Sequence, residues 1–198
     1  MRGKLYTPGY FEVYVGPMKS GKTLELAHRL DKFNYQTHAS YALFKPSLDD
    51  RFEGGVTKTR YRDIPLEATL LPHNNPEIIL SQELPLVVAF DEMQFYSPGI
   101  VNVVRELMDT NHHIIGTGLD LDFRGEPFGQ MGSMLALANE VYKLTGVCES
   151  CGVEGTRTQR LINGLPAHYD EPVVSIEGKK QKESYECRCL DCHDVPKD

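Results

Sequence analysis

The sequence has no long apolar run and no dense cluster of basic residues. None of its apolar stretches approaches the ~18 to 20 residues that a membrane-spanning helix needs. The first ten residues, MRGKLYTPGY, lack the apolar centre of a secretory signal peptide. The formal net charge is −7, and no run of Lys or Arg is dense enough to follow a nucleic-acid backbone. We therefore expect a cytoplasmic protein that binds neither a membrane nor a nucleic-acid polymer.

Cysteines are few, and four of the five form two CxxC pairs, Cys148/Cys151 and Cys189/Cys192. This spacing is typical of metal binding in a reducing compartment rather than of a disulfide framework. Four thiolates suit tetrahedral Zn²⁺ and leave no open position for water, so we predict a structural zinc site. The fragment CRCLDCH also offers Cys187 and His193 as ligands, and unliganded thiols are the remaining interpretation.

Strand-like and helix-like segments alternate along the first 145 residues. Strands are expected at 10–15, 40–45, 84–90 and 112–119, and helices at 21–36, 100–108 and 132–139. The run LPLVVAF is nearly continuous in apolar residues, as in strands buried on both faces of a parallel sheet. The alternation predicts an α/β fold, with a mostly parallel sheet and covering helices.

The amino-acid composition changes after residue 145, which predicts a second, small domain. Residues 146–198 are rich in glycine, cysteine and short strand-like pieces, whereas residues 1–145 are expected to form a nucleotide-binding domain. Segment 152–188 between the CxxC pairs is longer than the ~15 to 20 residues usual between such pairs. A bound metal would therefore hold together the ends of a long insertion.

Residues 16–23 match the pattern G-x-x-x-x-G-K-[ST] at every specified position, between a predicted strand and a predicted helix. Glycines let backbone N–H groups surround phosphate oxygens, and the helix dipole favours the anion. Lys22 can reach the β- and γ-phosphates and Thr23 can ligate Mg²⁺. A chance match arises in about one chain in a hundred of this length, so we predict a P-loop NTPase-like site. Its phosphate-binding residues are Gly16, Pro17, Met18, Lys19, Ser20, Gly21, Lys22 and Thr23.

An acidic pair, Asp91 and Glu92, directly follows the apolar run at 84–90. The pair is thus expected at the carboxyl end of a buried strand, where open α/β sheets bind ligands. There Asp91 could hold Mg²⁺ through water and Glu92 could serve as a base. Because a carboxylate can accept a proton from a substrate hydroxyl or from water, the pair alone fits a kinase and an ATPase equally. The alternative interpretation is that the two acids are solvent-exposed residues at the end of a strand and have no catalytic role.

Six fragments together resemble a known family: GPMKSGKT, DEMQF, GLDLDFRGEPFG, YKLTGVCESC, TRTQRL and SYECRCLDCH. Their order and approximate spacing are similar to those of the zinc-containing thymidine kinases, the class related to the cytosolic cellular enzyme. The resemblance spans Glu12 to His193. It implies pyrimidine salvage by transfer of the γ-phosphoryl group of ATP to the 5′-hydroxyl of thymidine, giving dTMP. It further implies a requirement for Mg²⁺, structural Zn²⁺, a homotetramer or a dimer, and feedback inhibition by dTTP.

The resemblance also assigns roles to residues of this chain. It makes Glu92 the general base and Asp91 a Mg²⁺-linked acid, and it places Asp49 and Arg51, otherwise an exposed loop charge pair, near the phosphates. It also places seven residues around the nucleoside: Met18, Phe95, Leu119, Phe123, Phe128, Thr158 and Tyr185. Without the resemblance, the apolar members of this set would be interpreted mainly as residues of the hydrophobic core.

The zinc-held segment would form a lasso whose backbone hydrogen-bonds the base. Where the family usually has Gly-Gly before the lasso tyrosine, this chain has Glu177-Gly178 and two extra residues. The candidate contacts are Ser175, Ile176 and Gly178. Fixed backbone donors would reject the wrong base strongly, whereas a missing methyl group costs only ~1 to 3 kcal/mol, so deoxyuridine is the expected weaker substrate.

Two hypotheses from other functional classes compete with a nucleoside kinase. A nucleotide-driven switch or ATPase with a zinc module would need no nucleoside pocket. A zinc-stapled interaction module leaves the phosphate loop unexplained.

Overall fold

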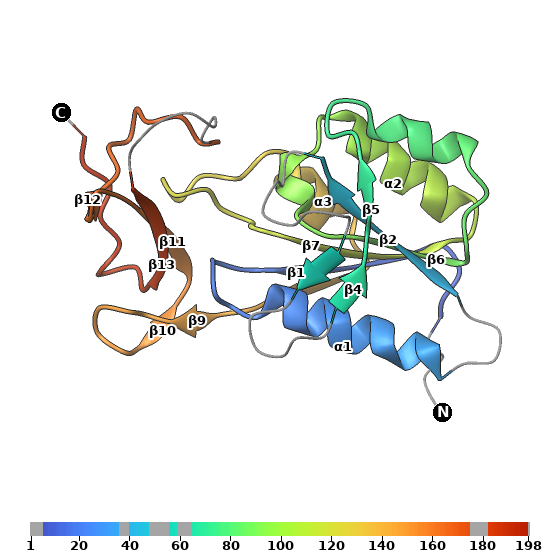
Figure 1. Ribbon diagram of the computed structural model, residues 1–198, viewed down its shortest axis with the longest axis horizontal. Coiled ribbons are helices and arrows are strands. Elements are labelled where there is room, and N and C mark those ends of the chain that lie inside the picture. The colour runs from blue at the N-terminus through green and yellow to red at the C-terminus, as the bar shows by residue number, and fades with distance from the viewer. Residues whose placement is uncertain (1–5, 36–39, 48–55, 59–64, 175–181, 198) are drawn as a thin grey trace.

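A six-stranded sheet forms the centre of the protein (Figure 1). The computed structural model describes residues 6–35, 40–47, 56–58, 65–174 and 182–197. In spatial order the strands are β5 (Thr69–Leu71), β2 (Tyr41–Pro46), β6 (Val87–Phe90), β7 (His113–Gly118), β1 (Tyr10–Val15) and β8 (Glu140–Lys143). All five neighbouring pairs are parallel. Their carboxyl ends therefore share one edge of the sheet.

Helices cover both faces of the sheet. Helix α1 (Lys22–Asn34) lies on one face, and α2 (Gly99–Asp109) and α3 (Met131–Leu137) lie on the other (Figure 1). Two short 3₁₀ helices, η2 (Pro76–Ser81) and η3 (Met93–Phe95), flank β6 in the chain.

Strand residues alternate between the two resulting cores. On β6, Val87 and Ala89 pack in the cluster that contains Leu30 of α1, whereas Val88 and Phe90 pack in the cluster of α2. Burial on both faces explains why β6 reads as a continuous apolar run rather than as an alternating one.

The predicted α/β alternation is confirmed, with two edge strands added. The helix expected at 21–36 begins one residue later, because Gly21 caps it in a left-handed conformation, and ends at Asn34. Sequence analysis missed β8 and β5, the two edges of the sheet. Strand β8 has the sequence EVYK and is largely exposed, so it carries little apolar signal.

Short antiparallel strands follow residue 145. They are β9 (Gly146–Val147), β10 (Glu154–Gly155), β11 (Arg157–Ile162), β12 (Leu165–Pro166) and β13 (Glu183–Arg188). Strand β11 pairs with both β12 and β13, and β9 pairs with β10 (Figure 1). A further antiparallel pair, β3 (Val56–Lys58) and β4 (Pro65–Glu67), precedes β5. Within the described ranges, the two hydrophobic clusters of the main sheet include no residue beyond Leu144.

None of the helices in the described part of the chain is both long enough and apolar enough to span a bilayer.

Candidate active site

The phosphate loop connects β1 to α1 at the carboxyl edge of the sheet. Gly16, Lys19 and Gly21 have positive φ angles of 148°, 64° and 88°. A Cβ atom at Gly16 would lie 2.3 Å from the carbonyl oxygen of Leu144, so only glycine fits there. Helix α1 starts without a side-chain cap. The N–H groups of Leu24 and Glu25 donate to the Gly21 carbonyl oxygen, which leaves those of Lys22 and Thr23 for another acceptor, as at anion-binding helix ends.

Lys22 is buried inside this loop. Its Nζ donates to the carbonyl oxygens of Gly16 (3.1 Å) and Pro17 (2.7 Å). Burial lowers the pKa of Lys22, while the charges of Glu92 and then Asp91 oppose that shift. The charges of the acidic pair therefore act on the lysine.

Other atoms of the loop also suit a phosphate group. The Ser20 hydroxyl oxygen is buried and has no hydrogen-bond partner among the described residues. The Met18 N–H donates to the Thr158 hydroxyl at 3.0 Å, which ties the loop to β11. Thr23 lies half-buried in the first turn of α1, where its hydroxyl can contribute to a cation site. These features fit an anion with an associated cation.

Asp91 follows β6 directly, as predicted, and is buried. Its Oδ1 accepts a hydrogen bond from the Glu92 N–H at 3.0 Å and another from the Thr117 hydroxyl. Burial, and next the charge of Glu92, raise the pKa of Asp91 to about 6, although the bond from Thr117 opposes the shift. A poorly solvated carboxylate of this kind gains from a nearby cation.

Glu92 has a left-handed backbone, with φ 54° and ψ 46°. Such strain in a residue other than glycine is common at functional sites. Its Oε2 accepts a hydrogen bond from Gln94 Nε2 at 2.6 Å, and Gln94 Oε1 accepts the Leu119 N–H at 3.1 Å. Buried Gln94 therefore fixes Glu92 relative to the end of β7. Sequence analysis did not assign this role to Gln94, although it stands inside the DEMQF fragment.

Most of the apolar residues assigned to the nucleoside occupy the segment after β7. Leu119, Phe123 and Phe128 are buried. The Phe128 ring meets the ring of Phe95 edge to face, with centroids 5.5 Å apart. The Phe123 carbonyl is held by His193 Nε2 at 2.8 Å.

The other nucleoside candidates come from β11 and β13. Thr158 is buried and contacts Met18 as described above. Tyr185 is half-buried, and its hydroxyl lies 3.5 Å from Glu183 Oε2. Five predicted site residues lie outside the described ranges and stay predictions: Asp49, Arg51, Ser175, Ile176 and Gly178.

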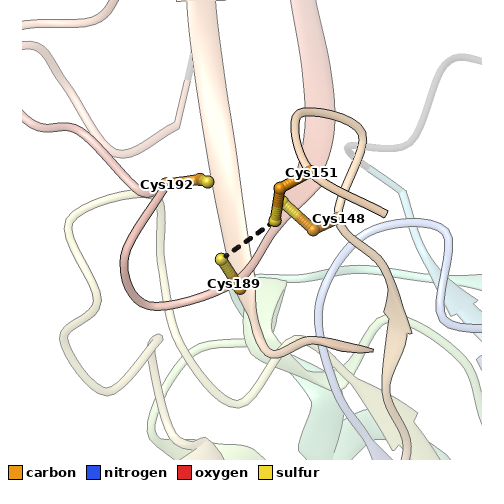
Figure 2. Close-up of side chains that lie close together, drawn as sticks. All are labelled: Cys148, Cys151, Cys189 and Cys192. Carbon is orange, nitrogen blue, oxygen red and sulfur yellow. Dashed lines mark hydrogen bonds between the residues drawn. The ribbon is translucent and has the colours of Figure 1, made fainter. Parts of the chain in front are cut away.

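Four cysteines from the segments that follow β9 and β13 converge (Figure 2). The sulfur atoms of Cys148, Cys151, Cys189 and Cys192 all lie within 4.8 Å of one another, and those of Cys151 and Cys189 are 3.7 Å apart. Burial opposes ionisation of Cys148, but hydrogen bonds from backbone N–H groups, that of Cys189 first, lower its pKa to about 6. Thiolates gathered in this way can hold a metal ion.

The two alternative ligands lie outside this cluster. Cys187 is buried against the β9–β10 pair, where a Cβ atom at Gly146 or Gly155 would come within 2.6 or 2.5 Å of its sulfur. His193 uses Nε2 for the Phe123 carbonyl. The arrangement therefore favours the four-cysteine set that the CxxC spacing predicts.

Comparisons with known proteins identify a family. A family model described as "Thymidine kinase" matches residues 9–193. A protein named "Thymidine kinase" from Coprothermobacter proteolyticus is 44% identical over 189 residues, which cover 95% of this chain and 92% of that protein. One of the same name from Deinococcus deserti is 42% identical over 193 residues, which cover 93% and 94%.

A more distant likeness exists to the X-ray structure of the Legionella pneumophila ATPase DotB, with 11% identity and a TM-score of 0.42. It covers 76% of this chain and 44% of that one, and so low a score supports no conclusion. The family match and the two relatives suffice: this chain belongs to the thymidine kinase family.

Proposed function

We propose that this chain transfers the γ-phosphoryl group of ATP to the 5′-hydroxyl of thymidine and releases ADP and dTMP. Family membership supports the reaction class, and the names of the two relatives support the substrate. The observation that carries the proposal is the sheet geometry: the phosphate loop with Lys22 follows β1, Asp91 and Glu92 follow β6, and the two strands are parallel members of one sheet. It brings a phosphate-binding lysine and a candidate base to one edge of the sheet.

Each residue near this edge has a distinct part in the reaction. Lys22 and the loop N–H groups bind the β- and γ-phosphates and orient the γ-phosphorus toward the nucleoside. Thr23 and Asp91 would hold Mg²⁺, which when bound neutralises charge on the phosphates.

Glu92 accepts the proton of the 5′-hydroxyl while the new bond from that oxygen to the γ-phosphorus forms. The bond between the γ-phosphorus and the β,γ-bridging oxygen breaks, and its electrons leave with ADP. Gln94 supports this role because its amide holds Glu92 Oε2 at 2.6 Å.

The buried residues Leu119, Phe123 and Phe128 support an apolar wall for the thymine methyl group. Deoxyuridine is then a weaker substrate, because a missing methyl contact is worth only ~1 to 3 kcal/mol. The lasso contacts to the base, and the phosphate contacts of Asp49 and Arg51, belong to the same proposal.

Further features complete the proposal. The four-cysteine cluster holds structural Zn²⁺, supported by the proximity of the four sulfur atoms. A domain boundary falls between residues 145 and 146, supported by the two hydrophobic clusters, which in the described chain stop at Leu144. A homotetramer or dimer and inhibition by dTTP rest on the family resemblance, and a cytoplasmic location, expected from the composition, belongs to the same proposal.

An assay with γ-labelled ATP tests the function. With Mg²⁺ present, label should pass to thymidine, and little inorganic phosphate should appear when thymidine is left out. Release of phosphate at the same rate with and without thymidine would instead support a nucleotide-driven switch. A Lys22→Ala variant should lose the transfer and serves as the control for contaminating kinases.

A further inference from the structure

Arg160, on β11, is among the most deeply buried side chains, with 1% exposure. Its guanidinium contacts three separate segments. Nη1 donates to the Pro172 carbonyl oxygen at 2.5 Å, and Nη2 donates to Glu183 Oε1 at 2.8 Å. The guanidinium carbon lies 5.4 Å from the centroid of the Phe123 ring. One cation thus joins β11, β13 and the segment after β7.

These contacts lead to two residues of the proposed nucleoside site. Phe123 is touched directly. Tyr185, which faces Arg160 in the β11–β13 register, is reached through the second carboxylate oxygen of Glu183 at 3.5 Å. Pro172 and Glu183 also flank segment 173–182. Arg160 therefore contacts the residues on either side of the segment that contains the candidate base contacts Ser175, Ile176 and Gly178.

The chemistry of the contact requires arginine. A guanidinium offers a planar set of donors and stacks on aromatic rings, whereas a lysine ammonium is a single point charge. A buried cation is tolerated only while its partners stay in place, because an unpaired buried charge is very costly. Since Nε has no acceptor among the described residues, Nη1, Nη2 and the ring face provide the contacts described here. Movement of any one partner weakens the support for the other two.

We propose that Arg160 is a positioning residue for the nucleoside. It holds Phe123, Pro172, Glu183 and, through Glu183, Tyr185 in one arrangement, and acts through them rather than on the reacting atoms. The proposal rests on the proposed thymidine kinase activity. It assigns Arg160 to thymidine binding and not to ATP binding, since in the described part of the chain the guanidinium bonds Pro172 and Glu183 and lies over the ring of Phe123, and none of these belongs to the phosphate loop.

Steady-state kinetics of Arg160→Lys and Arg160→Met test this assignment. We expect the KM for thymidine to rise ~10- to 100-fold, because small displacements of positioning groups have effects of this size, while the KM for ATP stays within about twofold of wild type. Lysine should not rescue, since one ammonium cannot reach the carbonyl, the carboxylate and the ring together. Arg188→Met is the matched control: Arg188 lies on β13 and pairs with Glu186 on its own strand, so both KM values should stay as in wild type.

Melting temperature and metal content show whether the Arg160 variants fold. If they do not fold, a second variant tests the same proposal. Glu183→Gln keeps the size and an acceptor oxygen but removes the charge, so a smaller rise in the thymidine KM is expected, again without change for ATP. Equal rises in both KM values, or an unchanged thymidine KM in folded variants, would overturn the positioning role alone. Wild-type protein that transfers no phosphate to thymidine would overturn the proposed function, and this proposal with it.

Discussion

Lys19 in the phosphate loop forms an ion pair with both carboxylate oxygens of Glu149, at 2.7 and 2.8 Å. Glu149 lies between Cys148 and Cys151, and its Oε1 also accepts the Cys187 N–H at 2.9 Å. Lys19 itself has a left-handed φ of 64°. The pair therefore anchors a strained residue of the phosphate loop to the hairpin that carries two of the clustered cysteines.

Glu149→Gln should raise the KM for ATP about two- to fivefold, because a partly exposed ion pair contributes ~0.2 to 1 kcal/mol. The amide oxygen can still accept the Cys187 N–H, so the hairpin itself should persist. Glu154→Gln on the same hairpin, where Glu154 accepts from the Thr145 hydroxyl, is the control and should leave ATP kinetics unchanged. A KM for ATP that falls instead would mean that Glu149 competes with phosphate for Lys19.

Glu92→Gln should lower kcat by ~10² to 10⁴ and leave thymidine binding largely intact, because the amide cannot accept the hydroxyl proton. Gln94 can still bond the new side chain, so its position should be kept. Turnover and thymidine affinity are measured on protein whose melting temperature matches wild type, beside the exposed control Glu106→Gln. Near-normal turnover of the folded variant would remove Glu92 from the mechanism.

Replacement of single cysteines separates metal ligands from packing. Cys189→Ser should reduce bound zinc, because its sulfur lies in the cluster, whereas Cys187→Ser should keep one zinc per chain, because that sulfur packs against Gly146 and Gly155. Metal content per chain, measured by atomic spectroscopy after dialysis, decides between them. Loss of zinc only in the Cys187 variant would contradict the assignment.

Glu12 on β1 is buried at 3% exposure and accepts three hydrogen bonds. The donors are Arg29 Nε (2.6 Å), His113 Nε2 (3.0 Å) and the Tyr14 hydroxyl (3.2 Å). The Thr7 N–H donates to His113 Nδ1, which leaves Nε2 as the protonated nitrogen. Burial acts to raise the pKa of Glu12, but His113 and then Arg29 outweigh it, so the pKa is lowered.

A lowered pKa in the folded protein gives stability that is present above the unfolded value and is lost as pH falls through the folded one. Glu12→Gln should therefore lower the free energy of unfolding at pH 7 by about 3 to 5 kcal/mol, the usual cost of breaking a buried pair. The difference in the free energy of unfolding between wild type and Glu12→Gln should shrink as the pH falls below about 4.5, near the ordinary carboxyl pKa. Urea unfolding between pH 7 and 3.5 measures it, with exposed Glu140→Gln as control. If the difference in the free energy of unfolding does not change with pH, the destabilisation comes from altered packing and not from the lost charge.

Local patterns were enough to predict much of this protein. The phosphate loop, the apolar β6 and the two CxxC pairs are each encoded by neighbouring residues, so spacing alone indicates their structure and chemistry. Both edge strands escaped notice, because β5 is only three residues long and β8 is mostly exposed.

Contacts between distant residues could not be predicted in this way. Glu12 and His113 stand 101 positions apart and Lys19 and Glu149 130 apart, and no periodicity links them. In the sequence, Arg160 also looks like an ordinary polar residue of a short strand. Its three partners come together only when β11, β13 and the segment after β7 are packed.

Discrimination among nucleosides tests the proposed pocket as a whole. In the proposed site, the buried residues Leu119, Phe123 and Phe128 would contact the thymine methyl group. Deoxyuridine should therefore have a lower kcat/KM, by a factor that corresponds to ~1 to 3 kcal/mol of lost transition-state stabilisation. Deoxycytidine should be rejected far more strongly. Its exchanged donor and acceptor would leave buried backbone groups unpaired, and a backbone cannot rotate to suit them as a side-chain amide can.

The measurement is kcat/KM for the three nucleosides at saturating ATP and Mg²⁺. Leu119→Ala provides a matched comparison that should narrow the gap between thymidine and deoxyuridine while leaving the rejection of deoxycytidine in place. Use of deoxycytidine within tenfold of thymidine by the wild-type protein would show that the backbone of this chain does not read the base.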